Sequence, residues 1–297
     1  MIVTRLTGGL GNQMFQYAAG LSLAQRNFDA LAVDVSGYGG EAARSETARA
    51  FGLSDFSITA QVLSYEEAAR RRNPYGVVSR LFRAANKRVL RRYYHDWHPE
   101  ILERTGDIYL EGYFQSERYF WNIPGLVRRE FTLAEGYQRS VAGIRAEIMS
   151  PGQVAVSLHV RRGDYVSNAR NAKELDICGV DYFARAVQHI EARTPNIRFY
   201  VFSDDPTWVR QHLPFVAGAV FVSERKTSDE KPLRPSQELS LMASCWHHII
   251  SNSTFSWWGA YLNARSDKIV IAPSTWTNSV EFHHTNIVPP NWVRLDA

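Results

Sequence analysis

From Pro151 onward, short apolar segments typical of strands alternate with segments of helical periodicity. The expected strands are 154–160, 197–202, 219–222, 248–251 and 268–272, and the expected helices are 181–193, 205–213, 236–246 and 254–263. Parallel strands need a long crossover between them, which is usually a helix. Strict alternation of strand and helix therefore predicts a parallel sheet wrapped by helices, an α/β fold.

The first half opens in the same style but is less regular. An expected strand at 2–6 leads through a glycine-containing loop into a helix at 12–26. Further strands are expected at 31–35 and 107–111, and helices at 65–72, 76–93 and 133–149. The chain of 297 residues is long enough for two domains. We expect an amino-terminal α/β domain at 1–150 and a second at 151–297, with a C-terminal tail that can cross back.

Polar residues gather where the expected strands of the second half end. Open parallel sheets bind ligands beyond the carboxyl ends of their strands, so these residues should share one site. The three groups are His159, Arg161 and Arg162 at the end of the first strand, Ser203, Asp204 and Asp205 after the second, and Asn252, Ser253, Thr254, Phe255 and Ser256 after the fourth.

This combination of side chains suits a nucleoside diphosphate. Guanidinium groups bind phosphate oxygens bidentately, and a helix N-terminus after Ser253 favours an anion. Asp204 and Asp205 can accept hydrogen bonds from a ribose or a base. The alternatives are that one of the two acids only caps the next helix and that His159 is a satisfied buried histidine.

Two other ligand classes are less well supported. Gly9 and Gly11 lack the third glycine of the dinucleotide fingerprint, whose place Met14 takes, so NAD binding is weakly indicated. Asp204 and Asp205 alone supply few ligands for a magnesium ion, and no cluster of histidine and cysteine accompanies them. We therefore expect no metal and no cofactor.

The positive charge is concentrated in one stretch. Nine of the 34 basic residues lie between Arg70 and Arg92, where no acidic residue occurs, although the net charge is only +4. The apolar spacing within this stretch predicts an amphipathic helix at 76–92. It can be a solvated helix packed on its domain or a peripheral membrane contact near anionic lipid. Nucleic acid is not expected, because no base-stacking module accompanies the charge.

Cysteine content and hydropathy bear on the compartment. The two cysteines, Cys178 and Cys245, cannot form a disulfide framework. No apolar run approaches the ~18 residues of a transmembrane span, and the first residues do not resemble a signal peptide. We expect a cytoplasmic protein, with peripheral contact at the inner membrane face if the basic helix binds lipid.

Five stretches in sequence order resemble the α-1,2-fucosyltransferases of glycosyltransferase family 11. They are 8–17 (GGLGNQMFQY), 112–117 (GYFQSE), 159–165 (HVRRGDY), 251–260 (SNSTFSWWGA) and 287–292 (IVPPNW). The resemblance implies a GT-B fold of two Rossmann-like domains facing a central cleft. It also implies metal-independent, inverting transfer of fucose from GDP-β-L-fucose to the 2-hydroxyl of a terminal galactose.

The resemblance also implies roles for individual residues. Arg161 and Arg162 would hold the GDP phosphates, while Asp164, Asp204 and Asp205 would contact the nucleoside or support the arginines. Glu238 would reach guanine or ribose. The loop that contains Gly9, Gly11, Asn12 and Gln13 would face the fucose and the β-phosphate from across the cleft.

Catalysis requires positive charge at the leaving diphosphate, and Arg161 is the first candidate for that role. Asp164 is a candidate base, His159 is a lesser one, and a loose transition state needs little base assistance.

Tyr113, Phe114 and Gln115 are candidates for binding the acceptor, a galactose-terminated oligosaccharide that can be lipid-linked. Two alternatives remain: a non-catalytic protein that binds sugar nucleotides or glycans, and a transferase that uses another GDP-sugar.

Overall fold

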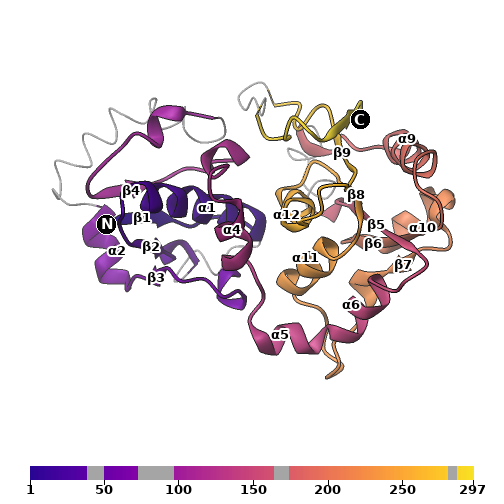
Figure 1. Ribbon diagram of the computed structural model, residues 1–297, viewed down its shortest axis with the longest axis horizontal. Coiled ribbons are helices and arrows are strands. Elements are labelled where there is room, and N and C mark those ends of the chain that lie inside the picture. Colours follow the sequence, from indigo (N-terminus) through magenta and orange to yellow (C-terminus); the bar gives the residue numbers. More distant parts are fainter. Residues whose placement is uncertain (39–49, 73–96, 164–173, 280–285) are drawn as a thin grey trace. The chain divides into compact units, whose positions relative to one another are not determined.

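The computed structural model describes residues 1–38, 50–72, 97–163, 174–279 and 286–297 (Figure 1). These residues form two compact units. The first contains the described residues up to Thr132 together with 286–289. The second contains the described residues from Leu133 to 279 together with 290–297. The expected basic helix at 76–92 and the candidate base Asp164 lie outside the described residues.

The first unit is built on a four-stranded parallel sheet with the strand order β3-β2-β1-β4. Its strands are β1 (Ile2–Arg5), β2 (Leu31–Asp34), β3 (Gln61–Val62) and β4 (Ile108–Leu110). Its helices are α1 (Leu10–Arg26), α2 (Tyr65–Arg72) and α4 (Pro124–Glu130). Short 3-10 turns lie at Ser36–Tyr38, Leu53–Asp55, Pro99–Ile101 and Glu117–Tyr119. Three of the four strands match the expected ones closely.

Helix α1 is buried along most of its length, and one glycine allows it to approach β1 closely. A Cβ atom on Gly20 would lie 2.0 Å from Oγ1 of Thr4, a residue of β1 that is itself buried. Both atoms belong to packed regular elements, so neither can move away cheaply. The contact fixes the distance between α1 and the sheet. Because α1 begins at Leu10, the candidates Gly11, Asn12 and Gln13 lie in its first turns and not in the expected loop.

We expect Gly20→Ala to destabilise the protein by about 1–3 kcal/mol, the usual cost of overpacking a filled core. Gly143→Ala is the matched control, because Gly143 is also helical but its added Cβ would meet nothing within 4 Å. Helix propensity should make that control slightly stabilising, by about 0.5–1 kcal/mol. Urea unfolding of both variants measures the difference, and equal stabilities would contradict the close approach.

The second unit contains a six-stranded parallel sheet with the strand order β10-β9-β8-β5-β6-β7. The strands are β5 (Val154–Val160), β6 (Ile197–Ser203), β7 (Val220–Phe221), β8 (His247–Ile249), β9 (Val270–Pro273) and β10 (Val293–Leu295). The helices are α5 (Glu135–Ser140), α6 (Ala142–Ile148), α9 (Val180–Glu191), α10 (Pro206–His212), α11 (Pro235–Ala243) and α12 (Thr254–Leu262). Short 3-10 turns lie at Pro214–Val216 and Val222–Glu224. This is the doubly wound order, in which the chain reverses its direction of winding between β5 and β8.

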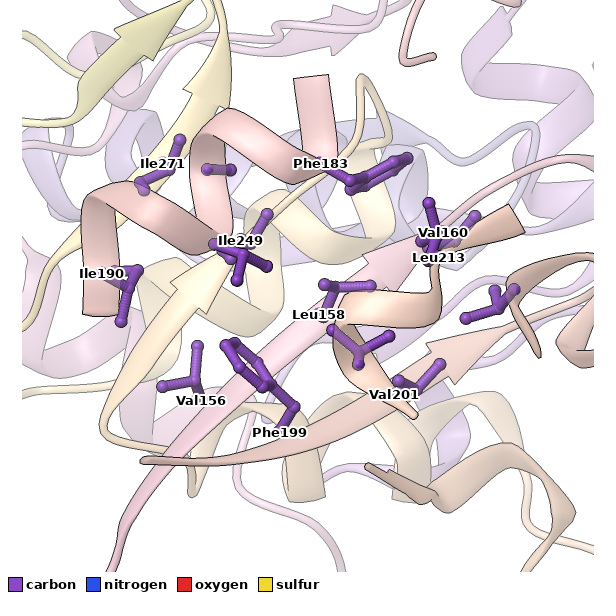
Figure 2. Packing of buried hydrophobic residues seen from close by; sticks show 14 of the residues in the cluster. Val156, Leu158, Val160, Phe183, Ile190, Phe199, Val201, Leu213, Ile249 and Ile271 are labelled. Atoms are coloured by element: carbon purple, nitrogen blue, oxygen red, sulfur yellow. The ribbon is translucent and has the colours of Figure 1, made fainter. Parts of the chain in front are cut away.

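Both faces of β5 are buried, as in most parallel sheets. The predicted apolar face of Val156, Leu158 and Val160 packs with residues of β6, β8 and α9 in one core (Figure 2). The opposite face, represented by Ala155, packs in a second core with residues of β6, α6 and α11, including Tyr200. The sheet is therefore a rigid base whose carboxyl edge carries the candidate residues.

The boundary between the two units differs from the expected position at residue 150. The helix expected at 133–149 is two short helices, because α5 ends and α6 begins around Val141. Val141, Ile144 and Ile148 are buried in the same core as Ala155 of β5. These contacts place α6 in the core of the second unit, and α5 belongs to the same compact unit, which begins at Leu133.

No helix in the described part of the chain is long and apolar enough to cross a membrane.

Candidate functional site

The point at which the second sheet reverses its winding is where a doubly wound fold binds its ligand. That point lies between β5 and β8, so it is bordered by Arg161 and Arg162 on one side and by the segment from Ser251 to Thr254 on the other. Asp204 and Asp205 follow β6, the neighbour of β5 on its other side. The predicted gathering of polar groups at one edge of the sheet is therefore observed.

Asp204 connects the ends of β5 and β6. Its Oδ2 atom lies 2.9 Å from Nη1 of Arg161, and its Oδ1 atom accepts a hydrogen bond from the backbone N–H of Arg162 at 2.9 Å. Gly163 permits this approach, because a Cβ there would lie 2.6 Å from Oδ2 of Asp204. Asp204 thus orients Arg161, which is one of the two roles expected for it.

Arg162 has a different set of neighbours. Its guanidinium carbon lies 4.1 Å from the centre of the Trp208 ring, and its charged nitrogens lie 3.8 Å from Asp205 and 4.0 Å from Asp176. Sequence reasoning missed Trp208 and Asp176. Trp208 could have been found, since it lies in the first turn of a helix that begins at this edge of the sheet.

Ser203 and Asp205 have structural roles at the end of β6. The side chain of Asp205 caps α10 by accepting a hydrogen bond from the backbone N–H of Trp208 at 3.0 Å. The Oγ atom of Ser203 accepts a hydrogen bond from the backbone N–H of Asp205, and its own N–H donates to Oγ of Ser223. The helix-capping alternative is therefore confirmed for Asp205, and direct contact of these residues with a ligand stays a prediction.

Glu238 on α11 faces the same network. The Oγ atom of Ser223 donates a hydrogen bond to its Oε2 atom at 3.4 Å. Burial, together with the negative charge of Asp204, raises the pKa of Glu238 to about 7. Near neutral pH this carboxyl group can therefore either donate or accept a hydrogen bond.

His159 lies in β5 and is buried, so it is not exposed at the carboxyl edge of the sheet. Its Nδ1 atom is 2.9 Å from Oγ of Ser251, and its ring lies beside Phe255. Burial and, secondarily, the positive charge of Arg161 lower the pKa of His159 to about 3. So weak a base is poorly matched to proton abstraction at neutral pH, which argues against the catalytic role expected for His159.

The segment after β8 combines anchoring with a helix start. Nδ2 of Asn252 donates to the carbonyl oxygens of Leu175 and Trp276, and Oγ of Ser256 donates to those of Ser251 and Ser253. These bonds give Asn252 and Ser256 structural roles. Ser253 is the N-cap of α12, but its side chain makes no capping bond there. A ligand contact by Ser253, Thr254 or Phe255 stays a prediction.

The candidate residues of the first unit lie at the start of α1, and two of them bond to neighbouring segments. Gly9 is the N-cap of α1, and Gly11 is buried within the helix. Gln13 bonds to Gly8, Ala50 and Gly52, and Oδ1 of Asn12 accepts a hydrogen bond from Gln115 at 2.9 Å.

The candidate acceptor residues differ in exposure. Phe114 is buried and packs edge-on against Tyr119, so its ring has a packing role instead of the expected acceptor contact. Tyr113 is partly exposed and lies close enough to Tyr38 to contribute to the raised pKa of that phenol, although burial is the main cause. Gln115 is also buried, and its amide group donates to Asn12, so acceptor contacts by Tyr113 and Gln115 stay predictions.

Within the described ranges, no group of three or more histidine, cysteine, aspartate or glutamate side chains could hold a metal ion. Independence from metal stays a prediction.

Two units built on parallel sheets, one of them doubly wound with basic residues at its switch point, are the architecture of the GT-B fold. A NodZ α-1,6-fucosyltransferase structure soaked with GDP-fucose has this fold, with a TM-score of 0.52 and 16% sequence identity over 88% of this chain and 91% of that chain.

Sequence comparison makes the assignment more specific. The chain is 30% identical to an alpha-1,2-colitosyltransferase of Escherichia coli, over 100% of this chain and 99% of that protein. It is 28% identical to galactoside alpha-(1,2)-fucosyltransferase 1 of Sus scrofa, over 98% of this chain and 73% of that protein. Residues 50–296 match the model of glycosyl transferase family 11. The chain belongs to glycosyltransferase family 11 and is therefore an enzyme rather than a non-catalytic binding protein.

Proposed function

We propose that this enzyme transfers L-fucose from GDP-β-L-fucose to the 2-hydroxyl of a terminal galactose, with inversion and without a metal ion. The observation that carries the proposal is the placement of Arg161 and Arg162 at the switch point of the doubly wound sheet, where Asp204 orients the first of them. Fixed cations at this position suit a ligand whose diphosphate must be neutralised without a metal.

In the proposed reaction, the galactose oxygen forms a bond to C1 of fucose while the bond from C1 to the β-phosphate oxygen breaks. Negative charge grows on the departing GDP, and Arg161 stabilises it. Because the proton of the hydroxyl group must leave on the acceptor side, Asp164 remains the candidate base. His159 is disfavoured by its low pKa.

A second donor is favoured by one specific comparison. The Escherichia coli relative at 30% identity is named for colitose, not fucose. Colitose is fucose without its 3-hydroxyl group, so the two donors share every group that the arginines would contact. A site that hydrogen-bonds the 3-hydroxyl of fucose would reject GDP-colitose strongly, whereas an apolar site would discriminate only modestly.

Nucleotide-dependent thermal shift followed by a transfer assay tests the proposal. We expect GDP and GDP-fucose to raise the unfolding midpoint by roughly 5–10 °C at about 100 times Kd, equally with EDTA and with magnesium. UDP and CMP should cause no comparable shift. With lactose as the acceptor, fucose transfer should exceed colitose transfer. A response to UDP-sugars alone, or only with metal, would overturn the proposed donor, and preference for GDP-colitose would assign the second donor.

For the acceptor, we propose a galactose-terminated oligosaccharide bound chiefly by the first unit, with Tyr113 and Gln115 as contacts. The name of the Sus scrofa relative, a galactoside transferase, supports a galactoside. A lipid-linked acceptor and a peripheral membrane contact through the basic stretch at 76–92 remain proposals from the sequence.

A further inference from the structure

The two neighbouring arginines at the candidate site are held in different ways. Arg161 is oriented by a carboxylate, since Oδ2 of Asp204 lies 2.9 Å from its Nη1 atom. Arg162 is oriented by an aromatic face, since its guanidinium carbon lies 4.1 Å from the centre of the Trp208 ring. A cation within about 6 Å of an indole centroid is attracted by the ring quadrupole.

The Trp208 ring is itself held from several sides. Its backbone N–H is bound by the capping side chain of Asp205, and its ring packs against the core of the second unit. The imidazole of His212, one turn further along α10, stacks on the indole at 4.7 Å with an interplanar angle of 13°. Nδ1 of His212 also lies 3.0 Å from the carbonyl oxygen of Trp208. The ring is therefore a fixed platform at the edge of the sheet.

Contact with the face of the Trp208 ring does not require the N–H groups of Arg162 as hydrogen-bond donors. All five N–H groups of a guanidinium lie in its plane, so contact with a ring face does not occupy them. Asp205 and Asp176, at 3.8 and 4.0 Å, attract the charge but are beyond hydrogen-bond distance. In the part of the chain that the structure describes, the buried Nε atom of Arg162 has no hydrogen-bond partner.

We propose that Trp208 is a positioning residue, which holds the guanidinium plane of Arg162 so that its in-plane N–H groups meet the diphosphate of the nucleotide sugar. The inference rests on the proposed function, because it requires a GDP-sugar at this edge. Trp208 acts through Arg162 and contacts no reacting atom. Its effect is preorganisation: a guanidinium already fixed in its binding plane loses less conformational freedom when the diphosphate arrives.

Trp208→Leu should weaken GDP binding about two- to thirty-fold, the range that corresponds to cation–π energies of ~0.5–2 kcal/mol. The KM for the donor should rise by more than kcat falls. Binding of guanosine, which has no phosphate, should be unchanged, whereas general damage to the site would weaken both ligands equally. Trp208→Phe should retain part of the effect, because phenylalanine also presents an aromatic face.

Trp246→Leu is the matched control. Trp246 lies in the same unit, is partly buried like Trp208, and carries the guanidinium of Arg265 at 3.2 Å from its ring centre. It directly precedes β8, at the end of the strand opposite the candidate site. This variant loses an equivalent stacked pair and should bind GDP as the unmodified enzyme does.

A double-mutant cycle provides the decisive result. In an Arg162→Ala background, Trp208→Leu should cause no further loss of GDP affinity, because the residue through which it acts is gone. Additive losses, or equal weakening of guanosine and GDP, would overturn the positioning role while leaving the proposed function intact. If the unmodified enzyme binds no GDP by calorimetry, the proposed function fails and the inference fails with it.

Discussion

Replacing Arg161 with alanine is expected to reduce kcat for sugar transfer by about 10²- to 10³-fold, the usual cost of removing one donor that stabilises developing charge. The substitution removes the cation that Asp204 orients toward the end of β5. It also leaves the Asp204 carboxylate without that partner beside the expected diphosphate, which adds repulsion. The KM for the donor should rise less than kcat falls, since charge on the phosphate is greatest in the transition state.

Arg161→Lys distinguishes positive charge from geometry. Lysine keeps the charge but cannot reproduce the planar, bidentate contact, so we expect it to recover only a small part of the lost rate. Arg265→Ala is the matched control, because Arg265 belongs to the same unit and pairs with Asp267 rather than with a candidate residue. Steady-state kinetics with GDP-fucose and a galactoside measures all three. Full activity in Arg161→Ala would remove Arg161 from the mechanism.

The sequence predicts most of the second unit because its signals are local. Alternation from Val154 to Val160 is sufficient for β5, whose observed bounds are the same, and the expected helix at 254–263 is α12. The order of the strands within the sheet is not predicted by the sequence and is known only from the structure. The gathering of Arg161, Asp204 and the start of α12 at one edge could be predicted, because the carboxyl ends of parallel strands lie at the same edge of the sheet.

What the sequence does not predict depends on contacts between distant segments. Nothing local to Val141 indicates that α6 packs with β5 instead of with the preceding domain. The guanidinium of Arg162 has Trp208 and Asp176 as neighbours, and neither residue belongs to a sequence motif. The burial of Phe114, which excludes the role expected for its ring, likewise comes from tertiary packing.

Lowering the pH from 7 to 5 is expected to destabilise the protein through its buried histidines. His248 is fully buried, with Nδ1 at 2.8 Å from Oγ of Ser157 and Nε2 at 2.8 Å from Nδ2 of Asn263. An amide nitrogen can only donate, so Nε2 must accept, which requires a neutral ring. Burial accordingly lowers the pKa of His248 well below its usual value, and it lowers that of His159 to about 3.

The sign follows from proton linkage. Below pH 6.5 the unfolded chain protonates these two histidines, whereas the folded chain does not until far lower pH. Each therefore lowers the free energy of unfolding by about 2 kcal/mol between pH 7 and pH 5. Glu238 acts oppositely: its folded pKa of about 7 exceeds the unfolded value, so protonation on acidification stabilises the fold by about 2 kcal/mol over the same range.

These opposing contributions can be separated by comparing the pH dependence of the unfolding free energy in the unmodified enzyme and in two variants. Glu238→Gln, which cannot titrate, should lose about 2 kcal/mol more unfolding free energy between pH 7 and pH 5 than the unmodified enzyme does, because all other titrating groups are common to both proteins. Glu135→Gln, at an exposed position on α5, should keep the unmodified profile. Urea unfolding at both pH values measures the three losses. A Glu238→Gln profile parallel to that of the unmodified enzyme would mean that Glu238 is already ionised in the fold, and its proton could then play no part in binding the nucleotide.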